Sequence, residues 1–134
     1  MITTITKRKI LIIDDEPGFT HMVRLTLENT GFYDVREENK PLLALSTAHE
    51  FKPDLIFLDV LMPDMDGGDV AAKLKADPEF RNTPVVFLTA TVPKREANSS
   101  GGLTSGGFLF LAKPVGIKEL VKCIEDNLKP AQQR

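Results

Sequence analysis

The sequence predicts a three-layer α/β domain in which helices cover both faces of a parallel β-sheet. Four short apolar runs, at residues 10–13, 55–58, 85–88 and 108–111, are each continuous rather than alternating. Continuous runs of this length are typical of strands that are buried on both faces. Helical patterns fill the intervals between the runs, and strands that alternate with helices favour a parallel sheet with right-handed crossovers.

Length and composition agree with one globular domain. The chain has 134 residues, of which 42% are hydrophobic and 27% charged, so it is long enough to bury a sizeable core. The formal net charge of −2 gives no reason to expect nucleic-acid binding. No run approaches the length needed to span a membrane and no signal peptide begins the chain, so we expect a cytoplasmic protein. The single cysteine, Cys123, is expected to be a passive helix residue.

The first half of the chain is expected to contain two strands and two helices. After the strand at residues 10–13, a helix is predicted at residues 17–30, because proline suits a first helical turn and Gly31 a C-terminal stop. Residues 32–37 mix polar and apolar side chains, which indicates a more exposed edge strand. A second helix is expected where Leu42, Leu45 and Ala48 recur at intervals of three residues.

Two further helices are predicted in the second half. The third contains Val70, Ala71 and Leu74 and ends at Asp77-Pro78. The last has the clearest pattern, because five apolar residues occupy one helical face. These residues are Ile117, Leu120, Val121, Ile124 and Leu128.

The interval between residues 91 and 108 gives the weakest helical signal. A short helix is expected near residues 93–97, which makes five helices in all. The glycine-rich stretch at residues 101–107 then predicts a mobile loop, because each glycine costs about 1 kcal/mol relative to alanine within a helix. We therefore divide the chain into a lead-in (1–8), one domain (9–129) and a tail (130–134).

Polar side chains follow each apolar run. Asp14-Asp15 follows the first run, Asp59 the second, Thr89 the third and Ala112-Lys113 the fourth. In a parallel sheet these positions emerge at one edge, where open α/β sheets bind ligands. Each residue taken alone has an ordinary interpretation, such as a helix start, a turn or a surface charge. Their joint placement is what indicates a site.

Three carboxylates gathered at one edge repel one another, and a hard divalent cation relieves that repulsion. Mg²⁺ prefers oxygen ligands, and one or two carboxylates plus a phosphate oxygen form a natural set. Asp59 then has the chemistry of a nucleophile toward phosphorus, giving an acyl phosphate. Lys113 and Thr89 are suited to bind the phosphoryl oxygens.

Four motifs, in this order and at these separations, resemble the response regulator receiver family across essentially the whole chain. They are Ile12-Ile13-Asp14-Asp15-Glu16-Pro17, Leu58-Asp59-Val60-Leu61-Met62-Pro63-Asp64-Met65-Asp66-Gly67, Leu88-Thr89-Ala90 and Ala112-Lys113-Pro114. The resemblance implies a flavodoxin-like, doubly wound sheet of five parallel strands in the order 2-1-3-4-5, with five helices. It also implies a cis bond between Lys113 and Pro114.

The resemblance also implies a role for each site residue. Asp59 matches the phosphoacceptor, Asp15 a direct metal ligand and Asp14 a ligand that acts chiefly through water. The Leu61 carbonyl matches a backbone ligand to Mg²⁺, for which Mn²⁺ can substitute. Thr89 and Phe110 match the switch hydroxyl and switch aromatic, and Lys113 matches the phosphate-binding lysine.

By the same resemblance, the chain is a signalling switch rather than an enzyme with an external substrate. Asp59 receives a phosphoryl group from a histidine kinase or a histidine phosphotransfer protein. Thr89 and Phe110 then shift, which changes contacts with a downstream target or output domain. A phosphorylation-dependent homodimer is one possible outcome, whereas contact with nucleic acid or membrane is not expected.

Two positions, Leu61 and Thr91, match those at which the family tunes phosphoryl lifetime. Leu61 has no polar group to orient an attacking water molecule, so slow self-dephosphorylation is expected.

Two alternatives remain open. Asp64-Met65-Asp66-Gly67 resembles the nucleophile motif of haloacid-dehalogenase-type phosphatases, but it does not directly follow an apolar run and leaves Asp14-Asp15 unexplained. The second alternative is a pseudo-receiver that binds proteins without phosphorylation.

Overall fold

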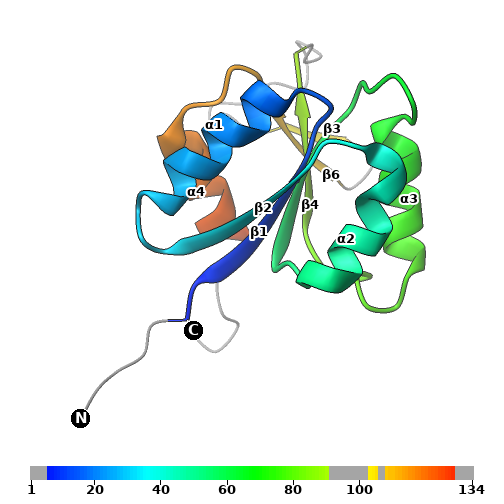
Figure 1. The fold of residues 1–134 in the computed structure, drawn as a ribbon, viewed down its shortest axis with the longest axis horizontal. Helices are drawn as coiled ribbons and strands as arrows, with labels where there is room; N and C mark the ends of the chain where they lie inside the picture. Colours follow the sequence, from blue (N-terminus) through cyan, green and yellow to red (C-terminus); the bar gives the residue numbers. More distant parts are fainter. Residues whose placement is uncertain (1–5, 91–102, 106–107, 129–134) are drawn as a thin grey trace.

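The computed structural model describes residues 6–90, 103–105 and 108–128. Its strands are β1 (Arg8–Ile13), β2 (Tyr33–Glu38), β3 (Leu55–Asp59), β4 (Val85–Thr89), β5 (Leu103–Ser105) and β6 (Phe108–Ala112). Its helices are α1 (Pro17–Glu28), a short 3₁₀ helix η1 (Pro41–Leu43), α2 (Ala44–Phe51), α3 (Gly67–Ala76) and α4 (Ile117–Asn127). Helices cover both faces of the central sheet (Figure 1).

The strands form one sheet in the order β2-β1-β3-β4-β6-β5. The first five strands in this order are all parallel to their neighbours, which confirms the predicted parallel sheet and its order. β5 is an addition, because it pairs antiparallel with β6 at the edge of the sheet. The prediction of a loop across residues 101–107 was therefore wrong for Leu103–Ser105, where backbone pairing with β6 outweighs the low intrinsic propensity of the flanking glycines.

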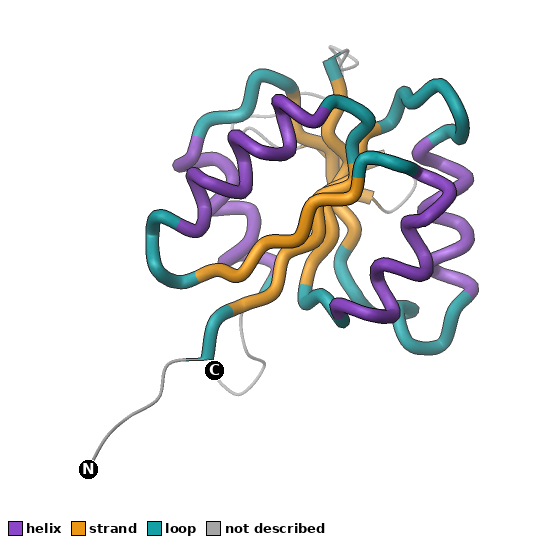
Figure 2. Tube along the Cα trace, viewed as in Figure 1, coloured by secondary structure: helices purple, strands orange, loops and turns teal. Residues whose placement is uncertain are grey.

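The predicted helices at residues 17–30, at Leu42–Ala48, at Val70–Leu74 and along the C-terminal apolar stripe correspond to α1, α2, α3 and α4. The helix expected near residues 93–97 lies outside the described residues. Figure 2 shows helices on both sides of the strands, with α1 and α4 packed against one face and α2 and α3 against the other, which gives the three layers that the sequence predicts.

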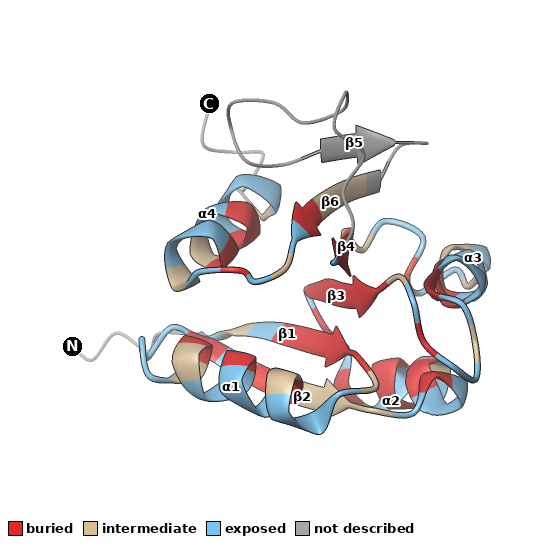
Figure 3. Cartoon of the chain, turned by 90° about the horizontal axis from the view of Figure 1, so that it is seen from above, coloured by how far each residue is buried: buried red, intermediate tan, exposed pale blue. Residues whose placement is uncertain are grey.

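Alternating residues of each central strand enter two different core layers. Ile10 and Ile12 of β1 pack with α1 and α4, whereas Leu11 and Ile13 pack with α2 and α3. All four side chains are fully buried, so β1 is apolar on both faces. This explains why the strands appear in the sequence as continuous apolar runs. In Figure 3, where red marks buried residues, β3 is red along its length and β1 is red beyond its start.

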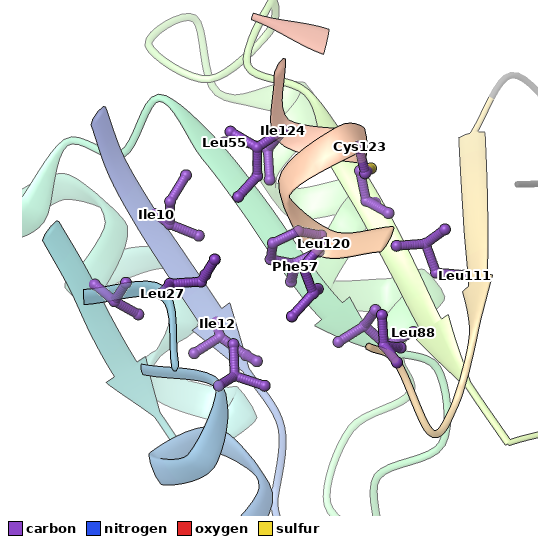
Figure 4. Close-up of a cluster of buried hydrophobic side chains, with 14 of the residues drawn as sticks. Ile10, Ile12, Leu27, Leu55, Phe57, Leu88, Leu111, Leu120, Cys123 and Ile124 are labelled. Carbon is purple, nitrogen blue, oxygen red and sulfur yellow. The ribbon is translucent and has the colours of Figure 1, made fainter. Parts of the chain in front are cut away.

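The layer beneath α4 is built mainly from branched aliphatic side chains. Leu120, Cys123 and Ile124 of α4 are buried against it, and Figure 4 shows Ile124 beside Leu55 and Leu120 beside Phe57 of β3. Burial raises the pKa of the Cys123 thiol to about 11, which leaves it protonated at neutral pH. This agrees with its expected passive role in the helix.

Helix ends are fixed by local polar contacts. Asp66 precedes α3, and its carboxylate accepts a hydrogen bond from the Gly68 N–H at 3.3 Å. Glu119 in the first turn of α4 accepts one from the Gly116 N–H at 3.0 Å. These contacts satisfy backbone donors that have no partner within the helix.

A histidine clamp joins α2 to the segment that follows α3. His49 Nε2 lies 2.7 Å from Asp77 Oδ2, and Nδ1 lies 2.8 Å from Glu79 Oε1. Because each ring nitrogen faces a carboxylate oxygen, the contacts favour the imidazolium, in which both nitrogens donate. Lys52 Nζ also lies 2.9 Å from Glu79 Oε2, and the His49 ring contacts Phe80. Hydrogen bonds to Asp77 and Glu79 raise the pKa of His49.

We predict that this clamp makes stability dependent on pH. A raised histidine pKa stabilises the fold below the unfolded pKa of 6.5, and that contribution is lost as pH rises through the folded value. Hydrogen bonds lower the pKa values of Asp77 and Glu79, so their contribution is lost in acid instead. Urea unfolding should therefore show a larger deficit for His49→Gln at about pH 5.5 than at about pH 9. An equal deficit at both values would contradict the imidazolium assignment, and His21→Gln is the control, because His21 faces one carboxylate, that of Glu37, instead of two.

Candidate functional site

Three carboxylates meet at the C-terminal edge of the parallel sheet. Asp14 and Asp15 follow β1 directly, and Asp59 is the last residue of β3. Since β1 and β3 are parallel neighbours, paired through Ile13 and Leu58, their ends lie side by side. One oxygen of each carboxylate lies within 4.8 Å of the other two. Asp14 and Asp59 are buried and Asp15 is half-buried.

Among the described residues, Lys113 supplies the positive charge of this site. Its Nζ donates to Asp14 Oδ2 at 2.6 Å and lies 3.6 Å from Asp59 Oδ1 and 3.7 Å from Glu16 Oε1. Lys113 directly follows β6, and its N–H donates a hydrogen bond to the Thr89 carbonyl at 2.9 Å, which fixes its backbone beside the end of β4. The Lys113–Pro114 peptide is cis, as the family resemblance implied.

One neighbour of the lysine could not be predicted from the sequence. Phe19 of α1 places its ring centroid 4.4 Å from Lys113 Nζ, a cation–π distance. Only the three-dimensional arrangement reveals this pair, because α1 and the end of β6 are far apart in the chain.

The electrostatics of the site oppose a charged Asp59. Burial and, to a smaller extent, the nearby charges of Asp14 and Asp15 together raise the pKa of the Asp59 carboxyl to about 6. Lys113 and a hydrogen bond from the Leu61 N–H act in the opposite direction. Burial likewise raises the pKa of Asp14, despite its hydrogen bond with Lys113. The pKa of Lys113 is raised, because its pairing with Asp14, Asp59 and Glu16 outweighs the effect of burial.

Gly67 brings α3 against the backbone of Asp59. A Cβ atom at position 67 would lie 2.2 Å from the Asp59 carbonyl oxygen and 2.9 Å from Val60 Cα. The Gly67 N–H also donates to the Val60 carbonyl at 2.9 Å. Only glycine fits this close approach, which fixes the loop between β3 and α3 directly behind the carboxylate.

The predicted switch residues lie on neighbouring strands. Thr89 is buried at the end of β4 and pairs in register with Ala112 of β6. Phe110 pairs with Phe87, and their rings stack with centroids 5.0 Å apart. Because alternate residues of a strand share a face, Thr89 and Phe87 point toward the same helical layer. Phe110 packs against that layer, beside α3 rather than within the acidic site.

The remaining predicted positions have different outcomes. The Leu61 side chain is 71% exposed, so it is accessible at the rim, whereas Thr91 lies outside the described residues. Asp64 and Asp66 do not follow a strand directly, and Asp66 serves as the N-cap of α3. The structure therefore does not provide the context that the phosphatase-type motif requires.

The oxygen atoms fit a magnesium site. Ligand oxygens about 2.1 Å from Mg²⁺ lie within roughly 4 Å of one another, so only a small contraction of the observed cluster is required. Hard carboxylate oxygens are also the ligands that Mg²⁺ prefers. A parallel α/β sheet with such a site, a nearby ammonium and a buried hydroxyl defines a domain that is suited to accept a phosphoryl group.

Comparisons with known proteins identify this class of domain. The family model of the response regulator receiver domain matches residues 10–125. The DNA-binding dual master transcriptional regulator RpaA of Synechocystis sp. is 34% identical over 121 residues, covering 90% of this chain and 49% of RpaA. The probable transcriptional regulatory protein TcrX of Mycobacterium tuberculosis is 38% identical over 114 residues, covering 84% and 46% respectively.

Solved structures agree with this result. The chemotaxis protein CheY4 of Vibrio cholerae is 28% identical, with a TM-score of 0.77, and the match covers 92% of this chain and 100% of that one. The signal receiver domain of a signal transduction histidine kinase from Syntrophus aciditrophicus is 30% identical, with a TM-score of 0.74 and coverage of 95% and 94%. The chain belongs to the response regulator receiver domain family, whose members act as phosphoacceptors in two-component signalling. It spans about half the length of the curated relatives that it matches.

The burial of Asp59 leads to a stability prediction. The pKa of the Asp59 carboxyl rises from 3.8 to about 6 on folding, so the folded state holds this proton more tightly than the unfolded state does. The free energy of unfolding therefore falls as pH rises and the proton is lost. At neutral pH without metal, Asp59→Asn should therefore have a larger free energy of unfolding than the wild type, by on the order of 2 kcal/mol in urea titrations. The difference should disappear below about pH 4. Asp64→Asn, at an exposed position, is the matched control, and a neutral or destabilising Asp59→Asn would contradict the cause assigned to the shift.

Proposed function

We propose that Asp59 is the phosphoacceptor of this receiver domain and that Asp14, Asp15 and the Leu61 carbonyl hold Mg²⁺. The observation that carries this proposal is the convergence of three carboxylates and Lys113 Nζ at one sheet edge. We place the domain at residues 9–129, between a short lead-in and a C-terminal tail.

Each residue has a distinct part in the proposed reaction. One oxygen of Asp59 attacks phosphorus, and the bond from phosphorus to the donor nitrogen breaks. When bound, Mg²⁺ neutralises negative charge on the phosphoryl oxygens. Lys113 lies 3.6 Å from Asp59 Oδ1, near enough to pair with an oxygen of the transferred group. Asp14 and Asp15 hold the ion. The positive charge of the ion then offsets the negative charges with which these two residues repel Asp59.

Movement of Thr89 and Phe110 is the proposed output. The Thr89 hydroxyl is suited to bind a phosphoryl oxygen, and Phe110 follows on the adjacent strand through its contact with Phe87. Within the described part of the chain, both rings border an apolar cavity of about 390 Å³ beside α3, which gives Phe110 room to move. Phosphorylation then favours one of two packings and changes the surface that a partner contacts.

We propose a phosphohistidine donor, either a histidine kinase or a histidine phosphotransfer protein. The output passes to a protein target or an attached domain, and homodimer formation is one form it can take. The relatives RpaA and TcrX carry names that describe transcriptional regulators, but their receiver-like part is only about half of each protein. We assign no nucleic-acid contact to this domain itself. Its own reactions are phosphoryl uptake and self-hydrolysis, with no turnover of an external substrate.

The cytoplasm is the proposed location, on the basis of the family. Among the helices that the structure describes, none has the length and apolarity required to cross a bilayer.

Intact mass spectrometry tests the acceptor assignment. With acetyl phosphate and Mg²⁺, the wild type should gain one phosphoryl group, because Asp59 is the nucleophile, and Asp59→Asn should gain none. Removal of Mg²⁺ with EDTA should suppress the gain. Asp64→Asn is the matched control and should be modified as the wild type is. An unmodified wild type would instead favour the pseudo-receiver alternative, and modification abolished only by Asp64→Asn would favour the phosphatase-type motif.

The exposed Leu61 leads to a second prediction, for the lifetime of the phosphorylated state. Its apolar side chain cannot orient water for attack, so Leu61→Asn should speed hydrolysis by roughly tenfold through a new hydrogen-bonding group. The rate is measured by following loss of the phosphoryl mass after the donor is removed. Leu61→Met is the control without a polar hydrogen-bond donor, and equal rates in all three proteins would contradict this role.

A further inference from the structure

Asn39 lies beside the acidic site, directly after β2, but none of the expected ligands or switch residues includes it. Its side chain is half-buried, and Nδ2 donates two hydrogen bonds. One goes to the Asp14 carbonyl oxygen at 2.8 Å and the other to Thr20 Oγ1 at 2.9 Å. Asn39 therefore connects the end of β2 with the residue that follows β1 and with the first turns of α1.

The contact with Asp14 replaces a backbone hydrogen bond. β1 and β2 pair in register up to Ile13 and Glu38, and the Asp14 N–H still donates to the Glu38 carbonyl at 3.1 Å. Continuation of this parallel ladder would bring the Lys40 N–H to the Asp14 carbonyl. Instead, the Lys40 N–H donates to Glu38 Oε2 at 3.0 Å. The Asn39 side chain supplies the missing donor, so the strands separate while the Asp14 carbonyl keeps its partner.

A second polar layer holds Asn39 in place. Thr20 is fully buried, accepts from Asn39 and donates to Glu37 Oε1 at 2.8 Å. Glu37 in turn pairs with Arg24 at 3.5 Å on the surface of α1. The amide of Asn39 is thus fixed from both sides, by Asp14 and by α1.

These contacts matter because Asp14 is held at four points. Its N–H and carbonyl are bound by Glu38 and Asn39, and its Oδ1 accepts from the Glu16 N–H at 3.0 Å. The fourth point is the bond from Lys113 Nζ to Oδ2. In the proposed function, Lys113 pairs with a phosphoryl oxygen, and the contacts with Glu38, Asn39 and the Glu16 N–H then remain to fix the orientation of Asp14.

We propose that Asn39 is a positioning residue that fixes Asp14 for magnesium binding by acting as a substitute backbone donor. This inference rests on the proposed function, because it takes Asp14 as a ligand of the ion. Asn39 touches neither the ion nor the phosphoryl group. It acts through the main chain of Asp14, as outer contacts of metal ligands do in other proteins.

The test is the affinity of the purified chain for Mg²⁺, measured by calorimetry without any phosphodonor. Asn39→Leu keeps the approximate side-chain volume, adds no charge and removes both hydrogen bonds. Its dissociation constant for Mg²⁺ should rise by about tenfold, the lower end of the range for lost outer contacts. The increase in melting temperature on addition of Mg²⁺ should shrink accordingly, because that increase depends on affinity.

Asn127→Leu is the matched control. Asn127 lies on α4, and its Nδ2 also donates to a backbone carbonyl, that of Cys123 at 2.7 Å. A purely structural role for both asparagines predicts lower stability in EDTA for both variants and wild-type affinity for Mg²⁺. An unchanged dissociation constant in folded Asn39→Leu would therefore overturn the inference.

Thr20→Val keeps the test decisive if Asn39→Leu does not fold. It removes the second anchor of Asn39 without touching the Asp14 carbonyl, so a smaller rise in the dissociation constant is expected. Wild-type affinity in that variant would likewise overturn the inference. Failure of the wild type to bind Mg²⁺ would instead contradict the proposed metal site.

Discussion

Mutual repulsion among Asp14, Asp15 and Asp59 is the interaction on which the arrangement of the site depends. The parallel strands bring these carboxylates to one edge, where burial makes their charges more costly than in water. Lys113 offsets part of this cost from the end of β6, with its ammonium closest to Asp14. Among the residues that the structure describes, Lys113 alone pairs with this cluster, and one positive charge does not balance three carboxylates, so the site favours a further cation. Burial is the main cause of the raised pKa of Asp59, and the same charge imbalance adds to it.

The two-sided core explains how the fold can maintain such an unfavourable cluster. Each central strand buries side chains on both faces, and burial on this scale is the main favourable contribution to folding. The strands that carry Asp59 and Thr89 lie in the middle of the sheet, with neighbours on both sides. Their ends are therefore fixed by residues that take no part in the chemistry. The charged edge and the apolar interior are separate parts of the same strands.

Much of the fold and of the site was predictable from sequence, because both depend on short local patterns. Continuous apolar runs predicted the parallel strands, and the polar residues that follow those runs predicted the acidic cluster. β5 was not predicted, since its three residues have no apolar run and form a strand only by pairing with β6. A signal was available: two glycines separate Ser105 from Phe108 in the sequence, and such pairs favour tight hairpins. These glycines also disfavour a helix, and on that ground a loop was predicted instead of a hairpin.

The contacts that surround the predicted site residues were not predictable in the same way. Asn39 and Phe19 belong to segments whose own periodicity says nothing about Asp14 or Lys113. Their roles depend on where β2 stops pairing with β1 and on how α1 crosses the end of β6. Such features arise from tertiary packing, so a single sequence carries no local pattern for them. The residues whose side chains carry the chemistry could be predicted from the sequence, whereas the residues that orient those side chains could not.

The close approach of Gly67 to the Asp59 carbonyl has a mechanical consequence. With no side chain between them, the first turn of α3 rests directly on the peptide that carries the acceptor. A rigid contact of this kind transmits displacement in either direction, whereas a layer of flexible side chains would absorb it. Any force that tilts α3 is therefore felt at the carboxylate, and strain at the carboxylate is felt along α3. The position of α3 and the position of the Asp59 carboxylate are therefore mechanically coupled.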